Sequence, residues 1–342
     1  MKYFVVPFAS LFIGLGIAGY MTWTNTASIA TVLQILLTVS LLCVLEISLS
    51  FDNAVVNATV IEKMDPIWRR RFLTWGIAIA VFGMRFVFPL LIVSVIAQIS
   101  MYDSLVMSLS KPEEYAQMML DAHLAVSSFG GAFLLMVCLD YFLSEEKDVH
   151  WIKVIEKPAA KISAFQSIEL LLALGVLMAI YINLPEKDQL TFLVSYLWGV
   201  MTFLIVHGIS ALLEGGGLSN LPFFSSGLGM FLYLEVLDAS FSFDGVVGAF
   251  AISNQLLIIM IGLGVGAFFV RGLTLYLVER KTLSQFKFLE HGAFYALGFL
   301  AMFMLLDSFF HFPEWLTALT GAAILGVSVL WSIKDNRKSA AQ

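Results

Sequence analysis

Apolar residues run along this chain in ten long stretches, which are separated by short segments that contain charged residues, glycine or proline. A helix needs about 20 predominantly apolar residues to cross the hydrocarbon core of a bilayer. The pattern therefore predicts ten transmembrane helices with mostly short connections. They are expected at residues 3–21, 29–52, 72–97, 122–142, 163–182, 190–213, 227–244, 255–278, 288–310 and 315–333.

The composition supports this interpretation and excludes several other classes of protein. Of the 342 residues, 60% are hydrophobic and only 13% are charged, whereas an ordinary soluble domain is about a quarter charged. A soluble globular enzyme and a disordered protein are excluded, and the net charge of −6 argues against a nucleic-acid partner. We expect an all-α polytopic membrane protein, a single membrane domain spanning residues 1–342 in a lipid bilayer, without enzymatic activity.

Basic residues predict the orientation of the helices. Ten spans with the N-terminus inside place fifteen lysines and arginines on the cytoplasmic side, whereas the other side has only Lys111 and Lys187. This asymmetry is typical of membrane proteins and puts both termini in the cytoplasm, including the polar tail at 334–342. The two longer loops, 98–121 outside and 143–162 inside, are expected to be solvated and to have no chemistry of their own.

The most informative feature is a pair of matching segments 192 residues apart. Residues 45–53 read Leu-Glu-Ile-Ser-Leu-Ser-Phe-Asp-Asn, and residues 237–245 read Leu-Asp-Ala-Ser-Phe-Ser-Phe-Asp-Gly. In both, an acid is followed by Ser-x-Ser-Phe-Asp and then by a small or amide residue. An arginine follows each segment in mid-helix, Arg85 in the first case and Arg271 in the second. The match predicts an internal repeat.

The two halves of the repeat are predicted to have opposite topology. The helix with the first motif runs from outside to inside, and the helix with the second motif runs from inside to outside. Inverted repeats whose broken helices meet near the midplane recur in transporters. We therefore predict two inverted-topology repeats of five helices, with helices broken at the acidic motifs. The halves are residues 1–182, with the motif at 45–57, and residues 190–333, with the motif at 237–249.

Ionisable residues inside the predicted spans are costly, at about 2.5–3.5 kcal/mol each on insertion scales. Only Arg85 and Arg271 offset the acids there. Several carboxylates cannot all stay ionised in a low-dielectric interior unless a cation joins them, and otherwise some must be protonated. The arrangement predicts cation binding, proton exchange or both. The acids are Glu46, Asp52, Asp140, Glu169, Glu235, Asp238, Asp244 and Asp307.

The neighbouring polar residues indicate which cation would bind. Carboxylates together with an amide and hydroxyl groups form an all-oxygen ligand set, which suits Mg²⁺, Ca²⁺ or Mn²⁺ rather than Cu or Zn. The neighbouring oxygen donors are Ser48, Ser50 and Asn53 in the first motif and Ser240 and Ser242 in the second.

Helical geometry limits how these acids can converge. Glu46 and Asp52 are six residues apart, which is about 600° around a helix, so they do not share a face. Either the helix unwinds around Ser50, which would also free backbone carbonyl oxygens as ligands, or the two acids serve different partners. The same reasoning applies to Asp238 and Asp244.

Each candidate also has a structural interpretation. Asp52 and Asp244 could cap helix ends, and Glu46 and Asp238 could be hydrogen-bonded structural acids. The two arginines could hold the acids as counter-charges or contact a substrate. The remaining candidates are Glu235, a secondary ligand or a structural acid, and Asp140 and Asp307, which could contribute to the site or face the membrane interface.

At the Ser-Phe-Asp-Asn and Ser-Phe-Asp-Gly segments the chain resembles the TerC family of bacterial integral membrane proteins, over roughly residues 30–330. It looks closest to a longer branch of that family catalogued as a domain of unknown function. The resemblance implies a LysE-like superfamily fold in the bacterial inner membrane and efflux of a divalent metal, with manganese as the expected substrate. Carried onto this sequence, the implied metal residues are Glu46, Asp52, Asn53, Asp238 and Asp244, and Gly245 departs from the first motif where Asn53 stands.

Several functions remain open at this point. The first is export of Mn²⁺ or a similar hard cation, coupled to protons that compete for the same oxygens; no cofactor is expected. The second is an anion or amino-acid exporter of the LysE-like type, for which the two arginines are the best support. The third is a non-transporting stress-response component of the tellurium-resistance kind. An intramembrane hydrolase is disfavoured because the chain has no HExxH motif. The sequence indicates no oligomeric state.

Overall fold

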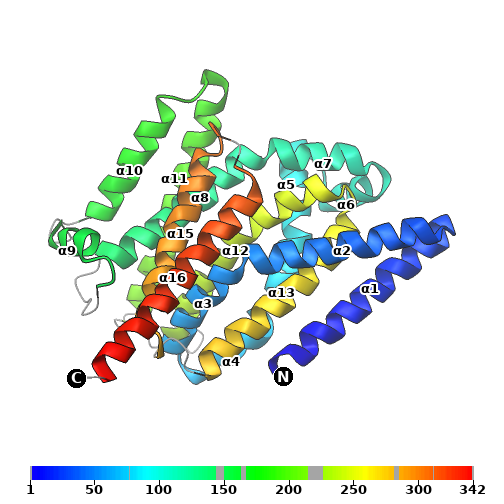
Figure 1. The fold of residues 1–342 in the computed structure, drawn as a ribbon. Helices are drawn as coiled ribbons and strands as arrows, with labels where there is room; N and C mark the ends of the chain where they lie inside the picture. Colours follow the sequence, from blue (N-terminus) through cyan, green and yellow to red (C-terminus); the bar gives the residue numbers. More distant parts are fainter. Residues whose placement is uncertain are drawn as a thin grey trace.

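The computed structural model describes residues 2–76, 78–143, 150–162, 167–214, 226–280, 285–310 and 312–340, and within these ranges the chain forms helices and no strand. Helices α1 to α16 follow one another along the chain and cross in a bundle (Figure 1). Their bounds are η1 Lys2–Phe4, α1 Val5–Thr26, α2 Ile29–Leu49, α3 Phe51–Lys63, α4 Pro66–Arg71, η2 Phe72–Gly76, η3 Ile79–Val87, α5 Phe88–Ala97, α6 Met101–Ser110, α7 Pro112–Asp121, α8 His123–Leu143, α9 Lys153–Ile162, α10 Ile168–Tyr181, α11 Glu186–Glu214, α12 Ser226–Ile252, α13 Leu256–Glu279, α15 Leu289–Leu306 and α16 Glu314–Ala340.

Eight candidate membrane spans in the described ranges are long and apolar enough to cross a bilayer. They overlap eight of the ten predicted stretches. The other two stretches also form helices, but α10 has only 14 residues, and α12 contains Glu235, Asp238 and Asp244 within its 27 residues. The helices thus occur where the apolar pattern predicts them, although the predicted number of ten spans is not reached by length and hydropathy alone.

Large apolar side chains cover the outside of the bundle. Phe12 of α1, Leu33 of α2 and Leu330 of α16 expose 71%, 61% and 68% of their surface. A soluble protein rarely tolerates such extended apolar patches, whereas a bilayer solvates them. Together with the candidate spans, this surface identifies a multi-pass α-helical membrane protein.

The core consists of two apolar clusters, and the motif helices connect them. In α12, Leu234 and Leu237 belong to one cluster, whereas Val246 and Phe250 belong to the other. The same holds for α2 and α3. Helix α3 packs into the first cluster, with Leu234 and Leu237, and α2 packs into the second, with Val246 and Phe250. Each acidic motif therefore lies where its helix passes from one cluster to the other.

The predicted helix break is present in the first motif and absent from the second. Helix α2 ends at Leu49, and α3 begins at Phe51 after Ser50, whose φ of −102° and ψ of 16° leave the helical range. The Asp52 carboxylate accepts the backbone N–H of Asn53 at 3.0 Å, so a side chain replaces a backbone acceptor at the break. The prediction of a second break is wrong, because α12 runs without interruption from Ser226 to Ile252.

Glycines let α13 lie close against α2 beside the first motif. A Cβ atom on Gly262 would lie 2.5 Å from the Cβ of Leu42, and one on Gly266 would lie 2.5 Å from the Cβ of Glu46. Real Cβ atoms do not approach so closely, so both positions require glycine at this helix separation. The contact fixes the Glu46 backbone against α13.

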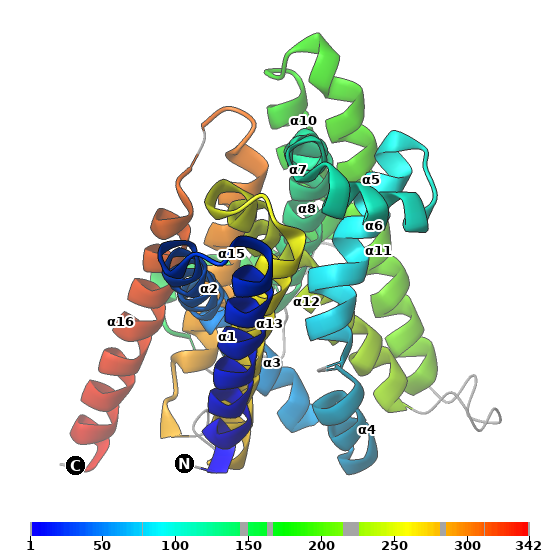
Figure 2. The same ribbon diagram turned by 90° about the vertical axis from the view of Figure 1, so that its right-hand side faces the viewer.

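Both termini lie on the same side of the bundle, together with α4, which contains Arg69, Arg70 and Arg71 (Figure 2). The turn between α10 and α11 lies at the opposite end (Figure 2), and Lys187 follows it in the first turn of α11. This arrangement agrees with the sidedness predicted from the basic residues, whereas the compartment that each side faces is still a prediction.

The two longer loops are not merely solvated connections, contrary to our expectation. The one at 98–121 folds into α6 and α7, and Tyr115 and Met119 of α7 are fully buried in the second apolar cluster. The one at 143–162 forms the amphipathic helix α9, whose Glu156 exposes only 2% of its surface. Residues 144–149 of that loop lie outside the described ranges, as do residues 163–166 at the start of the predicted span 163–182.

Candidate functional site

A small polar cavity lies between α3, η2, η3, α12 and α13, beside the break after α2. Its volume is about 50 Å³, which is room for one or two water-sized groups. Both motifs and both mid-helix arginines contribute to its wall. The lining residues are Ser50, Asn53, Asn57, Phe72, Gly76, Ala80, Val81, Arg85, Asp238, Ala267, Val270, Arg271 and Thr274.

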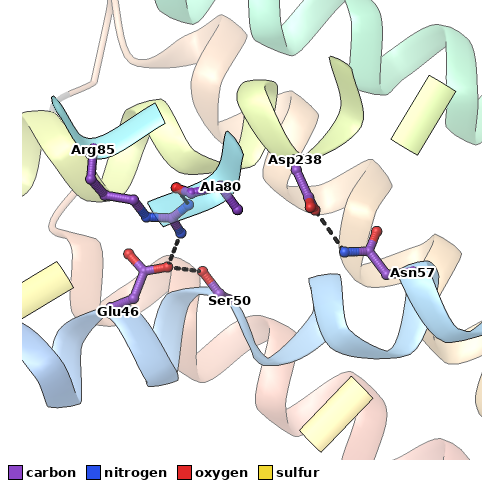
Figure 3. A network of polar contacts seen from close by, with 6 residues as sticks. All are labelled: Glu46, Ser50, Asn57, Ala80, Arg85 and Asp238. Carbon is purple, nitrogen blue, oxygen red and sulfur yellow. Dashed lines mark hydrogen bonds and ion pairs between the residues drawn. The ribbon is translucent and has the colours of Figure 1, made fainter. Parts of the chain in front are cut away.

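Glu46 and Arg85 form a buried ion pair on one wall of this cavity (Figure 3). Their side chains expose 1% and 7% of their surface. The Ser50 hydroxyl donates a hydrogen bond of 2.8 Å to the same Glu46 oxygen that pairs with Arg85. The Ser50 N–H still donates to the Glu46 carbonyl oxygen at 2.9 Å, so regular helical spacing places its hydroxyl one turn after Glu46, beside the carboxylate.

Arg85 lies in η3, a stretch of nine residues with π-helical hydrogen bonding. Such wide helical turns are rare and are frequent at functional sites. The Arg85 Nη1 atom donates to the carbonyl oxygen of Ala80 at 2.5 Å. This contact and the Glu46 pair hold the guanidinium group at the cavity wall (Figure 3).

The opposite wall joins the two motif helices through an amide and a carboxylate. The Asn57 Nδ2 atom of α3 donates to Asp238 Oδ1 of α12 at 2.6 Å (Figure 3). The side-chain oxygens of Asn53 and Asn57 are buried and have no hydrogen-bond partner. A buried acceptor without a donor is costly, so a group that interacts with oxygen lone pairs would stabilise this cavity. Asn57 was not predicted from the sequence, although it lies four residues after Asn53 on the same helix face.

Arg271 and Glu235 form a second set of charges beside the cavity. Arg271 lines it, and its Nε and Nη2 atoms are buried without a hydrogen-bond partner. Its guanidinium group lies 5.5 Å from the centre of the Phe72 ring. Both carboxylate oxygens of Glu235 are also buried and unpartnered, and a Cβ atom on Gly76 would lie 2.9 Å from one of them.

The second motif is not a copy of the first at atomic level. A Cβ atom on Gly245 would lie 3.4 Å from Glu46 Oε2, so the glycine that replaces Asn53 in the repeat leaves room for the carboxylate of the first motif. Ser242 is buried and its hydroxyl has no partner. Ser240 bonds instead within its own helix, to the Val236 carbonyl oxygen. The Asp244 side chain lies outside the described residues.

Asp52 does not reach the cavity that holds Asn53 and Asp238. It lines a separate, smaller cavity of about 20 Å³ with residues of α15 and α16, and a Cβ atom on Gly321 would lie 3.6 Å from its Oδ2. Ser48 lines this second cavity and bonds to the Val44 carbonyl oxygen. The break after Leu49 therefore directs Glu46 and Asp52 to different cavities, as the spacing of six residues allows.

The acids that end α8 and α15 line neither of these two cavities. Asp307 follows α15 and lies 3.3 Å from the Nδ1 atom of His123, at the start of α8. It also accepts the backbone N–H of Phe312 at 3.1 Å, which supports its interpretation as a residue at the membrane interface. Asp140 lies in the last turn of α8 and is partly buried.

The charges around the first cavity are close to balanced. Glu46, Asp238 and Glu235 provide three carboxylates, and the two arginines provide two guanidinium groups. In the part of the chain that the structure describes, no three His, Cys, Asp or Glu side chains form a group that could hold a metal ion. A cation here would therefore rely on amide and hydroxyl oxygens in addition to carboxylate.

A larger cavity of about 410 Å³ lies between α1, α2, α6 and α13. Thr22, Asn25, Thr31, Ser108 and Gln255 contribute neutral polar groups to its wall, and none of the described residues that line it is charged. It lacks the charge needed to bind an ion in a low-dielectric region. The smaller, charged cavity is therefore the candidate functional site.

The fold and this buried charged cavity define a polytopic α-helical membrane protein with a polar site inside its bundle. A family model described as "Protein of unknown function (DUF475)" matches residues 51–339, and the chain belongs to that family. No curated protein and no solved structure matches the chain.

Proposed function

We propose that this protein is a membrane transporter that exports a divalent metal cation through the cavity between α3, α12 and α13. The observation that carries the proposal is the convergence of Asp238 with Asn53 and Asn57, whose side-chain oxygens have no hydrogen-bond partner. Mg²⁺, Ca²⁺ and Mn²⁺ prefer oxygen ligands of this kind. The resemblance to the TerC family favours Mn²⁺ as the substrate, and the bacterial inner membrane as its location.

The size of the cavity supports an ion rather than an organic substrate. Sites for small organic molecules typically enclose about 300–1,000 Å³, whereas this cavity has about 50 Å³. An ion that has lost most of its hydration shell fits this volume. The backbone around Ser50, where the helix is broken, and the Ser50 hydroxyl add oxygens close to the same cavity.

Proton coupling would follow from the same charges. A bound cation and a proton compete for carboxylate oxygens, and Glu235 has both oxygens buried without a partner. We propose that protons replace the metal when it is released on the outer side. The inverted relation of the two halves would provide alternating access to the site.

A second candidate is export of an anion or an amino acid, as in LysE-like transporters. Its support is that Arg85 and Arg271 line the same cavity and that two nitrogens of Arg271 have no partner. The neighbouring carboxylates, which outnumber the arginines, and the small volume make this candidate weaker. A non-transporting stress-response role, of the tellurium-resistance kind, would not explain why these costly charges are buried inside the bundle.

The test is cellular manganese content and growth in excess manganese, in a bacterium that lacks its own exporters. Wild type should lower the manganese content and restore growth, because the site carries the metal out. Asp238→Asn should lower the efflux rate about tenfold or more, and Asn57→Ala should lower it to a smaller extent. Asn183→Ala is the matched control, because Asn183 lies in the turn after α10, where its amide donates to the Ala179 carbonyl oxygen at 2.8 Å.

Two outcomes would contradict metal export through this site. If wild type at normal abundance leaves cell manganese unchanged, the metal proposal fails, and intracellular amino acids measured by mass spectrometry would then test the second candidate. If Asp238→Asn and Asn183→Ala both export manganese like wild type, the protein is an exporter but its metal passes elsewhere.

A further inference from the structure

A buried carboxylate ties the cytoplasmic-loop helix α9 to the membrane bundle. Glu156 of α9 exposes 2% of its surface and accepts the backbone N–H groups of Trp151 and Ile152, each at 3.1 Å. The Tyr295 hydroxyl of α15 donates to it at 3.1 Å. These three donors are neutral, so they bind the carboxylate without cancelling its charge.

Two imidazole rings approach one oxygen of this carboxylate. The Nδ1 atom of His150 lies 3.5 Å and the Nε2 atom of His291 lies 3.6 Å from Glu156 Oε2. In the part of the chain that the structure describes, no lysine or arginine is within ion-pair distance of Glu156. Among the described side chains, the two histidines are therefore the groups that can balance the charge of Glu156, and each does so when it is protonated.

Other titratable groups surround the cluster on the neighbouring helices. Tyr141 of α8 stacks on Phe294 with ring centres 3.6 Å apart, and its ring centre lies 5.8 Å from that of His291. Glu290 pairs with Lys63 of α3 at 3.6 Å. Tyr141 and Tyr295, the two tyrosines beside the cluster, are both uncharged near neutral pH. The titratable groups around the cluster are Cys138 and Tyr141 on α8, His150 and Glu156 on the α9 segment, Glu290, His291 and Tyr295 on α15, and Lys63 on α3.

The segment 150–156 is attached to the bundle by packing as well as by charge. The Trp151 ring lies against Phe288, which precedes α15, Tyr295 of α15 and Trp331 of α16, with ring centres 5.7 to 6.4 Å apart. A change in the charge balance at Glu156 would therefore act on the contact between this segment and two membrane helices.

We propose that His150, His291 and Glu156 form a proton-dependent latch that docks the α9 segment onto α15 and α16. Imidazole changes its charge between pH 5 and 8. Toward the acidic end of this range an imidazolium neutralises Glu156 and the segment is docked. As the pH rises, both imidazoles become neutral and leave a buried, uncompensated carboxylate, which strongly destabilises the docked state. The latch would thus open when the solution around α9 becomes alkaline. It does not depend on which substrate the protein moves.

The test is hydrogen–deuterium exchange of the full chain, purified in detergent, at about pH 6 and about pH 8.5, which bracket the titration of histidine. Exchange is expressed as protection factors, so that the intrinsic effect of pH on amide exchange is removed. In wild type, protection of the amides of residues 151–162 should fall about tenfold or more at the higher pH. In Glu156→Gln, which keeps an oxygen acceptor and loses the charge, protection should be the same at both values.

His123→Gln is the matched control, because His123 also faces a carboxylate, that of Asp307, but at the other end of α8. It should keep the pH dependence of residues 151–162. If Glu156→Gln does not fold, the double variant His150→Gln/His291→Gln replaces it and should show low protection already at about pH 6. Equal protection of wild type at both pH values would overturn the proposal, and so would a pH dependence that persists in Glu156→Gln.

Discussion

At the scale of single residues, the candidate site shows how buried charges are tolerated. Glu46 and Arg85 are both nearly inaccessible, and each has a second polar partner, Ser50 for the carboxylate and the Ala80 carbonyl for the guanidinium group. Such a pair adds little net stability, because desolvation offsets the attraction. Removal of one partner, however, leaves a buried charge without compensation, and this is the larger effect.

Arg85→Met should therefore destabilise the protein more than the double variant Glu46→Gln/Arg85→Met. The single change leaves the Glu46 carboxylate buried beside a methionine, at a cost of about 3–5 kcal/mol, whereas the double change removes both charges. The thermal unfolding midpoint of the purified protein in detergent measures the difference. Equal midpoints for the two variants would show that Glu46 is not ionised in the folded protein.

The sequence predicted which residues are buried and charged, but not how they are distributed between sites. Glu46, Asn53, Asp238 and both arginines do lie at one cavity or on its wall. Asp52 was predicted to belong to the same ligand set, but it lies in a different cavity. The orientation of α3 after the break decides which of its faces meets α12. That orientation depends on packing between segments far apart in the sequence, and the spacing of residues along one helix gives no information about such packing.

At the scale of helices, close contact between α2 and α13 positions the first motif. Gly262 and Gly266 lie on one face of α13, one turn apart, where Leu42 and Glu46 of α2 approach. These two glycines therefore form the close-packing face of α13 toward α2. In a membrane, contacts between helices rely on such packing rather than on the hydrophobic effect.

Gly266→Ala should destabilise the protein, whereas Gly264→Ala should be nearly neutral. A Cβ atom at 266 would lie 2.5 Å from the Glu46 Cβ and 2.9 Å from the Cys43 carbonyl oxygen, and neither atom can move without a shift of α2. At 264 the nearest atom is a Val81 methyl group at 3.4 Å. Overpacking of this kind costs about 1–3 kcal/mol. Unfolding midpoints of the two variants test the prediction, and a Gly266→Ala protein as stable as Gly264→Ala would contradict this helix separation.

Helix breaks were predicted for both motifs from one argument, the spacing of six residues between acids, and only the first is present. In the first motif, the Asp52 carboxylate accepts the backbone N–H of Asn53, so a side chain competes with the helical hydrogen bonds there. In the second motif, Ser240 donates to the Val236 carbonyl within a continuous helix. Similar sequences thus adopt different backbones, because their side chains have different partners.

At the scale of the whole molecule, the two motifs face one cavity from opposite helices, α3 and α12, which the order of the helices along the chain brings together. The resulting site is asymmetric: an asparagine on one side corresponds to a glycine on the other, and the space beside that glycine is occupied by Glu46. The first motif therefore provides the side-chain amides and the second provides the carboxylate, so changes at equivalent positions should differ in effect.

The orientation of the chain in the membrane is the remaining property of the whole molecule that the sequence predicts. Cysteines introduced at Arg70 and at Lys187, in a background without Cys43 and Cys138, lie at opposite ends of the bundle. A membrane-impermeant maleimide should label Lys187→Cys in intact spheroplasts and Arg70→Cys only after lysis, because basic residues are retained on the cytoplasmic side. Both positions are exposed, so failure to react would reflect sidedness rather than burial. The reverse pattern would place both termini outside, and the proposed export would then run in the opposite direction through the same site.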